Sequence, residues 1–284
     1  MYRALQQGED DILYIYFTMT EIFDNIRSIY HFSVPCEELL PYVEFFSESS
    51  AVATYTHTGN TSFTVKMFPS YTPTFWFNLG VAYELGVGKD RYHIPAGRDV
   101  LVVRNSTVER FNHPADHLFS VKFFPGALET ILGVDQSGMT DRVVDLHEIL
   151  PATLIRQVKA QRHFEQRMKV LQDFLLMQLQ TKKKRDHYLH FVQQTIAEYE
   201  AGNLQYNVGE MCAQMFTTSK TISRYFDRVI GVTPKNYFSV VRARTALTAF
   251  VANRQLFIPD KFGYYDMSHF YREMVKFTGQ RMEK

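Results

Sequence analysis

Two short stretches near the end of the 284-residue chain place hydroxyl and cationic side chains at helical spacing. In each stretch, three such residues fall at i, i+3 and i+4, which is one face of an α-helix. The two sets are Lys220, Ser223 and Arg224, and Ser268, Tyr271 and Arg272. A short exposed helix with such a face suits the major groove of duplex DNA, where guanidinium groups pair with guanine and cations meet phosphates.

Both stretches also carry an apolar stripe on another face. The stripes occupy positions i, i+4 and i+7 and consist of Ile222, Phe226 and Val229, and of Phe270, Met274 and Phe277. Arg272 follows Arg224 by 48 positions and occupies the equivalent place. One such helix would be an ordinary amphipathic helix. Two of them, each preceded by a short helix and a turn, favour a tandem helix-turn-helix arrangement.

Turn and capping residues stand where the helices should begin. A helix ending near Met215 precedes Thr217 and Thr218, whose hydroxyls can cap a helix from about Ser219. In the second unit, Gly263 supplies a tight turn and Asp266 can cap the next helix. Pro259 is tolerated in the first turn of the short helix ahead of Gly263, and deeper in a helix it would cost about 3 kcal/mol.

A long helix is expected between the two units. Thr233 can cap it, Pro234 fits its first position, and it runs to about Asn253. Its expected buried side consists of Tyr237, Val240, Val241, Leu247 and Val251. Arg242 and Arg244 are then left for solvent or phosphate. A rigid helix here would hold two recognition helices for successive major grooves, which lie about 34 Å apart.

These patterns assign a role to each polar residue. Arg224 and Arg272 are the candidates for base contacts, since a guanidinium pairs bidentately with guanine. Lys220, Ser223, Ser268 and Tyr271 are secondary candidates, and Arg242 is expected at phosphate. The alternative for Arg224 and Arg272 is an ion pair within the chain that holds helices together.

The first 130 residues favour short strands separated by turns. The expected strand segments are ATYTHT (53–58), TSFTVKMF (61–68), TFWFNLGVAYEL (74–85), DVLVVRN (99–105) and HLFSVKFF (117–124). Strands at this spacing predict a barrel-like, cupin-like or sandwich domain able to hold a small ligand. The aromatic residues Tyr71, Phe75, Trp76 and Phe77 are candidates for lining that site, and the alternative is that they form core.

From about residue 126 the pattern changes to helical. The segments ALETILGV (127–134), DRVVDLHEIL (141–150) and 153–180 are expected as helices, the last with a leucine-rich stripe. This stripe could mediate a homodimer or pack on its own domain. The charged run 181–186 predicts a linker between a regulatory domain, 1–180, and a helical domain, 187–284. The fold class is therefore α+β with an all-α C-terminal domain.

Composition and charge narrow the function. Residues 1–150 carry 10 Lys and Arg against 19 Asp and Glu, whereas 151–284 carry 21 against 11. This division suggests that one half meets a polyanion, and chance patterning of solvated surfaces explains it equally well. Cys36 and Cys212 are too few for a disulfide framework. The sequence contains neither a signal peptide nor a membrane-length apolar run, so a cytoplasmic location is expected.

An enzyme is the weaker reading. No nucleophile elbow or phosphate loop occurs, and no catalytic residue, metal or cofactor is expected. His113 and His117 are four residues apart, but Pro114 argues against the helix that a metal pair would need. A cupin-type metal-dependent enzyme domain fused to a DNA-binding domain is the alternative.

The segment 187–279, about a third of the chain, resembles the DNA-binding domain of the AraC family of bacterial transcription regulators. The matching residues are Ile222, Arg224, Phe226, Gly231, Thr233, Pro234, Tyr237, Arg242, Ala246, Ile258, Phe262, Gly263, Tyr264, Asp266, Ser268, His269, Phe270, Arg272, Phe277 and Gly279. The segments HFSVPCEELLPYVEFF, IPAGRDV, VKFFPGALETILGV and MTDRVVDLHEIL resemble the N-terminal domain of one branch of these regulators. The resemblance implies a transcription regulator that binds double-stranded DNA. Its other expected partners are a small-molecule effector, a second copy of the chain in a homodimer, and RNA polymerase.

Overall fold

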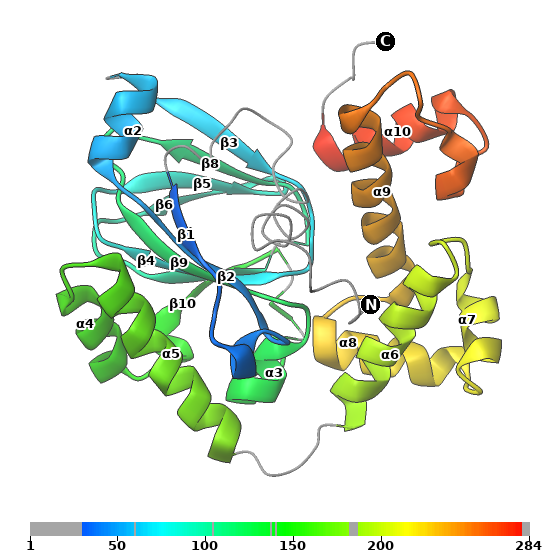
Figure 1. The fold of residues 1–284 in the computed structure, drawn as a ribbon, viewed down its shortest axis with the longest axis horizontal. Coiled ribbons are helices and arrows are strands. Elements are labelled where there is room, and N and C mark those ends of the chain that lie inside the picture. The colour runs from blue at the N-terminus through cyan, green and yellow to red at the C-terminus, as the bar shows by residue number, and fades with distance from the viewer. Residues whose placement is uncertain are drawn as a thin grey trace.

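The structure is a computed structural model, and it describes residues 30–59, 61–103, 105–136, 138–139, 141–181 and 187–279. A β-rich half with helices on one side is followed by an all-α half (Figure 1). The α+β class expected from the sequence is therefore confirmed. Within the described residues, no helix has the length and apolar character needed to cross a bilayer.

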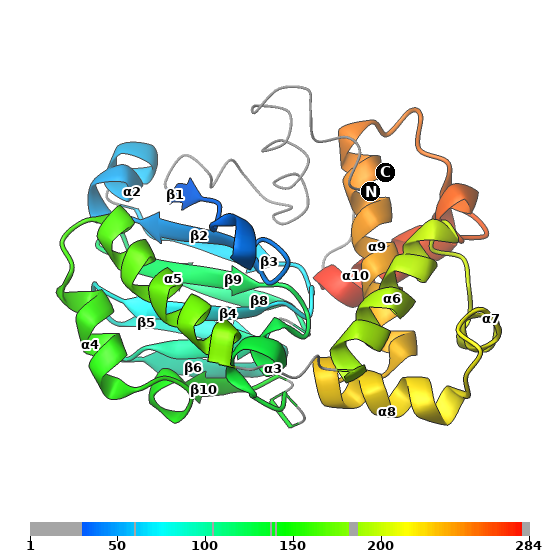
Figure 2. The same cartoon turned by 60° about the horizontal axis from the view of Figure 1, so that its bottom comes forward.

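The β-rich half consists of two antiparallel sheets. Its strands are β1 (Tyr30–Ser33), β2 (Val43–Ser49), β3 (Phe63–Met67), β4 (Pro73–Asn78), β5 (Tyr83–Val87), β6 (Asp90–Ile94), β7 (Val100–Val103), β8 (Val108–Asn112), β9 (Leu118–Phe123) and β10 (Val143–Asp145). One sheet has the order β1-β2-β9-β4-β7-β10 and the other β3-β8-β5-β6. The two sheets stack as layers (Figures 1 and 2). Among the described strands the sheets do not join into a closed barrel. Of the forms expected from the sequence, the domain is therefore the two-sheet sandwich, and barrel-like or cupin-like describes it only loosely.

The central strands are buried on both faces because each face packs on a different layer. In β4, Phe75 and Phe77 point to the helix-covered face of the six-stranded sheet, whereas Trp76 points to the four-stranded sheet. In β7, Leu101 and Val102 divide in the same way. Side chains alternate along a strand, so neighbouring residues necessarily enter different cores.

Three helices cover the outer face of the six-stranded sheet: α3 (Ala127–Leu132), α4 (Ala152–Ala160) and α5 (Phe164–Thr181) (Figure 2). The helix expected over 153–180 is thus interrupted between α4 and α5. Its apolar residues Leu154, Val158, Leu171 and Leu175 are buried against the sheet. The stripe packs on its own half, as one of the two alternatives predicted.

Two short segments differ from the expected secondary structure. The segment expected as a strand at 53–58 lies in helix α2 (Ala51–Thr58), because the Ser50 hydroxyl accepts the Ala53 amide and starts a helix. The helix expected at 141–150 is instead strand β10 followed by a single 3-10 turn, η3 (Leu146–Glu148). Val143 and Val144 pair there with β7, which overrides the local helical pattern. A further 3-10 turn, η2 (Glu37–Leu39), precedes β2.

The C-terminal half is helical, as expected. It contains α6 (His187–Ala201), α7 (Val208–Gln214), α8 (Ser219–Ile230), α9 (Pro234–Ala252), the 3-10 turn η4 (Pro259–Phe262) and α10 (Met267–Thr278). One apolar core joins these elements, and Phe68 and Tyr71 of the β-rich half enter it. Most of the proposed linker, 182–186, lies outside the described residues.

Candidate nucleic-acid interface

Helices α8 and α10 are copies of one another in length and capping. Each has 12 residues, and corresponding positions differ by 48. Thr218 caps α8 by accepting the Thr221 amide at 3.2 Å, and Asp266 caps α10 by accepting the His269 amide at 2.7 Å. Both helices end at a glycine with positive φ, Gly231 at 83° and Gly279 at 68°, which only glycine adopts without cost. The capping residues expected from the sequence are confirmed.

The expected apolar stripes are also in place. In α8, Ile222, Phe226 and Val229 are fully buried. In α10, Phe270 and Met274 are fully buried, and Phe277 is half-buried. Burial of these stripes turns the opposite faces outward.

The elements ahead of the two helices are less alike. Helix α7 begins with a capping box, in which the Asn207 side chain accepts the Glu210 amide and Glu210 accepts the Asn207 amide. Its counterpart in the second unit is the single turn η4, with Pro259 at the first position. Pro259 therefore lies where proline is tolerated. Gly263 follows with a φ of 69° and makes the expected turn.

The polar faces predicted to meet DNA reach solvent. Lys220, Arg224, Ser268 and Arg272 are exposed, while Ser223 and Tyr271 are half-buried. The Tyr271 ring packs against Phe250 and Phe270, and the Arg224 guanidinium lies 5.2 Å from the Tyr225 ring centre.

The alternative role for the two arginines, an ion pair within the chain, has no support among the described residues. None of the ion pairs found in that part of the chain includes Arg224 or Arg272.

Arg242 has a partner within the chain. Its Nη2 donates to both carboxylate oxygens of Glu273, at 3.1 and 3.2 Å, and its guanidinium lies 5.0 Å from the Tyr264 ring centre. Burial lowers the pKa of Arg242, but the Glu273 carboxylate together with Tyr264 and Tyr199 outweighs burial and holds that pKa above its usual value. The pair connects α9 to α10, so the guanidinium expected at phosphate already stabilises the second unit.

Helix α9 connects the two units and follows the expected boundaries. Thr233 caps it, Pro234 opens it, and Tyr237, Val240 and Leu247 are buried. Val251, which was expected on the buried side, is instead largely exposed because it lies in the last turn, beyond the packed part of the helix. Figure 1 shows α9 running between α8 and the unit that contains α10.

The C-terminal ends of α8 and α10 dock on the β-rich half at equivalent positions. Gln136 Nε2 donates to the carbonyl oxygen of Val229 at 2.7 Å. The Thr107 hydroxyl donates to the carbonyl oxygen of Phe277. Val229 and Phe277 differ by 48 positions, and both carbonyls belong to the last turn of a helix, where no amide of the helix can reach them. The β-rich half thus caps both helices.

Further contacts hold the C-terminal end of α8. Arg228 Nε donates to Glu129 Oε1 at 2.8 Å. Gly126 packs so tightly that a Cβ there would lie 2.5 Å from Leu189 Cδ1 and 2.7 Å from Val229 Cγ1. All of these docking contacts, including the bonds of Gln136 and Thr107, lie at the C-terminal ends of α8 and α10. They therefore leave the polar residues near the N-terminal ends of the two helices uncovered.

The four aromatic residues predicted to line a ligand site are distributed over three environments. Tyr71 contacts Tyr237 of α9, with ring centres 5.5 Å apart. Phe75 and Phe77 lie in the core beneath the helices. Trp76 alone faces a cavity between the two sheets.

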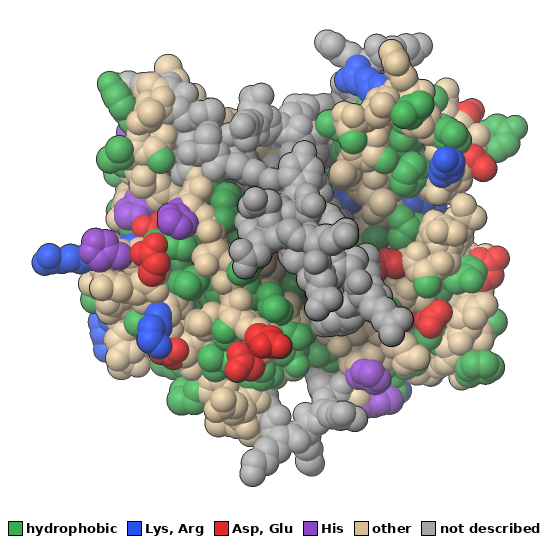
Figure 3. All heavy atoms as spheres, viewed as in Figure 1, with side chains coloured by type: hydrophobic (Ala, Val, Ile, Leu, Met, Phe, Trp, Pro, Cys, Tyr) green, Lys and Arg blue, Asp and Glu red, His purple; other side chains and the backbone are tan. Residues whose placement is uncertain are grey.

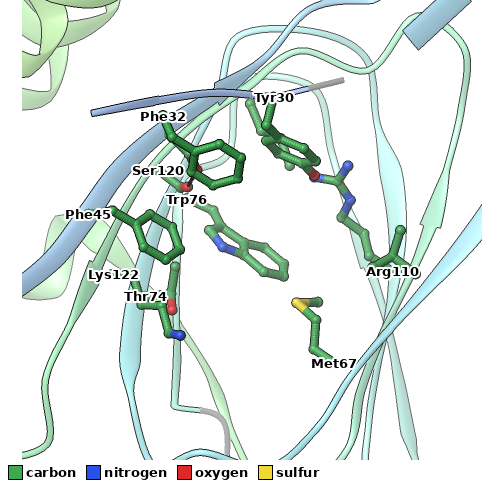
Figure 4. Close-up of a pocket in the computed structure, with 12 residues that line it drawn as sticks. Tyr30, Phe32, Phe45, Met67, Thr74, Trp76, Arg110, Ser120 and Lys122 are labelled. Atoms are coloured by element: carbon green, nitrogen blue, oxygen red, sulfur yellow. Dashed lines mark hydrogen bonds between the residues drawn. The ribbon is translucent and has the colours of Figure 1, made fainter. Parts of the chain in front are cut away.

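That cavity is enclosed by residues of both sheets (Figure 4). It contains about 560 Å³ of space not occupied by protein atoms, part of it open to solvent. Tyr30, Phe32, Phe45 and Trp76 form aromatic walls (Figure 4). Thr74 Oγ1 is buried there without a hydrogen-bond partner among the described residues.

Two buried cations also line the cavity. Lys122 Nζ lies 2.8 Å from Glu44 Oε2, and Arg110 Nη2 lies 4.0 Å from Asp116 Oδ2. Burial raises the pKa of Asp116, and the Arg110 charge only partly opposes this shift. Strand alternation places Lys122 and Trp76 on this inner face. Sequence reasoning missed Lys122, which stands in the mostly apolar strand β9, and Arg110, which stands in the mixed strand β8.

The histidines do not form a metal site in the described part of the chain. His117 Nε2 lies 2.8 Å from Glu48 Oε1, and His113 Nδ1 accepts the Ala115 amide at 3.2 Å. No group of three or more His, Cys, Asp or Glu side chains among the described residues could hold a metal ion.

Comparisons with known proteins give structural neighbours only. No family model matches the chain, and no curated protein matches it. ToxT from Vibrio cholerae is 11% identical, with a TM-score of 0.45, covering 78% of this chain and 95% of that one. The AraC-like transcriptional activator CuxR is 10% identical, with a TM-score of 0.27, covering 79% of this chain and 88% of that one.

One of these neighbours carries a ligand. ToxT from Vibrio cholerae strain SCE256 was solved with a bound unsaturated fatty acid, and it is 11% identical with a TM-score of 0.41, covering 78% of this chain and 92% of that chain.

The residues that dock the helical half on the β-rich half were not found by sequence reasoning. Gln136, Thr107 and Glu129 lie in loops or at helix ends and form no motif with their partners. The repeat spacing of 48 positions relates their partners Val229 and Phe277 to each other but gives no signal for these three residues.

Proposed function

We propose that the chain is a transcription regulator that binds specific sequences of double-stranded DNA. In this proposal, residues 187–284 form the DNA-binding domain, 181–186 the linker, and 1–180 a regulatory domain. The observation that supports it is the duplication of a capped, 12-residue helix with an exposed polar and cationic face. Such a protein acts in the cytoplasm of a bacterial cell and catalyses no reaction.

The proposed contacts follow from exposure and chemistry. Arg224 and Arg272 read bases, and Lys220, Ser223, Ser268 and Tyr271 support them at neighbouring bases or phosphates. Helix α9 has 19 residues and therefore spans about 28 Å at 1.5 Å per residue. That length is comparable with the spacing of about 34 Å between successive major grooves, so α8 and α10 can enter neighbouring grooves on one face of the duplex.

The experiment that tests this function is selection of bound sequences from random duplex DNA by the full chain. Enrichment of one motif in two parts about one helical turn apart is expected. Arg224→Ala should then relax the preference at one base pair and cost about 1–3 kcal/mol of binding free energy. Failure to enrich any sequence would contradict the proposal, and an unchanged preference in the variant would remove Arg224 from base reading.

The regulatory part of the proposal rests on the cavity between the sheets. Its aromatic walls, together with Arg110 and Lys122, fit a small organic anion with an apolar body. Glu44, the partner of Lys122, also interacts electrostatically with Arg244 of α9. An anion that competes with Glu44 for Lys122 would therefore change the electrostatic interaction between Glu44 and the helical half. A thermal-shift screen of aromatic and aliphatic carboxylates tests this, because a ligand of the folded state raises its stability. Homodimerisation and contact with RNA polymerase stay predictions.

The alternative, a metal-dependent enzyme domain, is tested by metal analysis of the purified protein and by adding EDTA during thermal unfolding. We expect no stoichiometric metal and no shift of the midpoint.

A further inference from the structure

The most exposed aromatic side chain among the described residues lies in the turn of the first helix-turn-helix unit. Phe216 is 97% exposed and follows α7 by two residues. Its φ is +48°, in the left-handed region that costs a non-glycine residue about 1–2 kcal/mol in backbone strain. The Thr217 amide donates to the Cys212 carbonyl, and the Phe216 amide donates to the Ala213 carbonyl. This is the closing turn of a helix in which glycine is the usual residue.

The second unit has an exposed aromatic side chain in the corresponding turn. Tyr265 is 91% exposed and immediately precedes Asp266, the capping residue of α10. Phe216 precedes Thr218, the capping residue of α8, by two positions. Figure 3 shows hydrophobic side chains reaching the outer edge of the helical half. Water contact with such rings is unfavourable, so two of them in equivalent turns indicate a surface that is covered in the working complex.

The proposed function identifies what covers them, and the inference rests on it. Each ring lies next to the N-terminus of a helix whose exposed side chains include Lys220 and Arg224, or Ser268 and Arg272. When the N-terminal part of such a helix enters the major groove, the preceding turn meets the wall of the groove. The wall carries phosphates, which attract the nearby cations, and deoxyribose rings, which are its apolar part.

We propose that Phe216 and Tyr265 are positioning residues that pack against deoxyribose as α8 and α10 enter the groove. The rings add apolar contact that does not depend on base sequence, and they set how deeply each helix enters. The strain at Phe216 is then explained, because glycine would satisfy the turn but offer no side chain to the DNA.

The test compares DNA affinity of the full chain and of Phe216→Ala and Tyr265→Ala, on the selected sequence and on a scrambled duplex, over a range of salt concentrations. We expect each variant to bind about tenfold more weakly to both duplexes, a loss typical of partly burying one aromatic side chain. The dependence of affinity on salt should not change, because no charge is removed. Lys220→Ala should instead reduce the slope of log affinity against log salt concentration by about one, the amount expected for the loss of one phosphate contact.

Two further variants separate binding from folding. Phe216→Gly should bind DNA as weakly as Phe216→Ala and should unfold at a higher temperature than the wild type, since glycine relieves the positive φ. Tyr55→Ala removes a comparably exposed ring, 60% exposed, from α2 in the β-rich half, and it should leave affinity unchanged.

Several outcomes would overturn the inference. Unchanged affinity in both alanine variants would overturn it. A loss of affinity confined to the selected sequence would also overturn it, because it would mean that the rings read bases. Unchanged DNA affinity with lost transcription activation would assign the rings to a protein partner. If the wild type binds no DNA, both the proposed function and this inference are wrong. If the wild type binds DNA and the Phe216 and Tyr265 variants bind it equally well, only this inference is wrong.

Discussion

Gln136 of the β-rich half donates a hydrogen bond of 2.7 Å to the carbonyl oxygen of Val229 in the last turn of α8. Thr107 makes the equivalent bond to Phe277 in α10. The two helices proposed to bind DNA are therefore fixed at one end to the β-rich half, and these contacts leave their opposite ends uncovered.

Loss of the Gln136 bond should destabilise this docking. Gln136→Leu keeps a similar volume but leaves the Val229 carbonyl without its buried donor, and we expect the free energy of unfolding to fall by about 1–3 kcal/mol. Urea denaturation measures the change. Thr107→Val is the matched variant at the second helix, and the two losses should add because they affect separate helix ends. An unchanged stability in both variants would mean that water replaces both donors.

Gly126→Ala should separate the two halves. The added Cβ would lie within 3 Å of Leu189 and Val229, and the φ of +81° strains any residue except glycine. We expect a loss of about 1 kcal/mol or more in stability, and a larger radius of gyration in solution scattering. Gly97→Ala provides the control, since its φ of +79° gives comparable strain but a Cβ there meets no atom within 4 Å. Equal compactness of the two variants would contradict the predicted separation.

Arg242→Met should affect stability more than DNA binding. The substitution removes the donor from which Glu273 accepts at 3.1 and 3.2 Å. It leaves a largely buried carboxylate that still accepts from the Ser239 hydroxyl at 3.0 Å but has lost its cation. We expect unfolding to become easier by about 2 kcal/mol. The salt dependence of DNA affinity should not change, in contrast to Lys220→Ala. A flatter salt dependence with unchanged stability would instead place Arg242 at phosphate.

Asp99 should make the fold less stable as pH rises through the acidic range. Burial raises the pKa of Asp99, although Lys159 at 2.9 Å and the Asn78 amide at 2.8 Å partly lower it. The unfolded chain therefore releases this proton at a lower pH, near 4, than the folded protein does. Above that pH the unfolded state gains relative stability until the folded-state pKa is passed.

Asp99→Asn tests the sign of this effect. The asparagine amide does not titrate, so the stability of the variant relative to the wild type should increase as pH rises from about 4 and then level off. Urea denaturation at a series of pH values gives the difference. A difference that does not vary with pH, or one that decreases, would show that the pKa of Asp99 is not raised.

Much of the helical half could be predicted because its signals are local. Thr218 and Asp266 cap helices with their own side chains, and Pro234 opens a helix because its ring fixes φ. The 3.6-residue period of Ile222 and Phe226 then orients each helix. The errors fell where distant partners decide. Val143 forms a strand because β7 supplies its hydrogen bonds, and the aromatic residues Phe75 and Trp76 enter different cores because a sheet separates them.

The sequence by itself determined the two capped helices, their repeat of 48 positions and the side chains that each presents outward, since caps and periodicity act within a few residues. Only the tertiary structure decided that Arg242 pairs with Glu273, that a cavity with Lys122 and Arg110 lies between the sheets, and that Gln136 and Thr107 cap the two helices from another part of the chain. Those contacts join residues 31 to 170 positions apart, and side chains so far apart in sequence leave no shared period or spacing by which to recognise them.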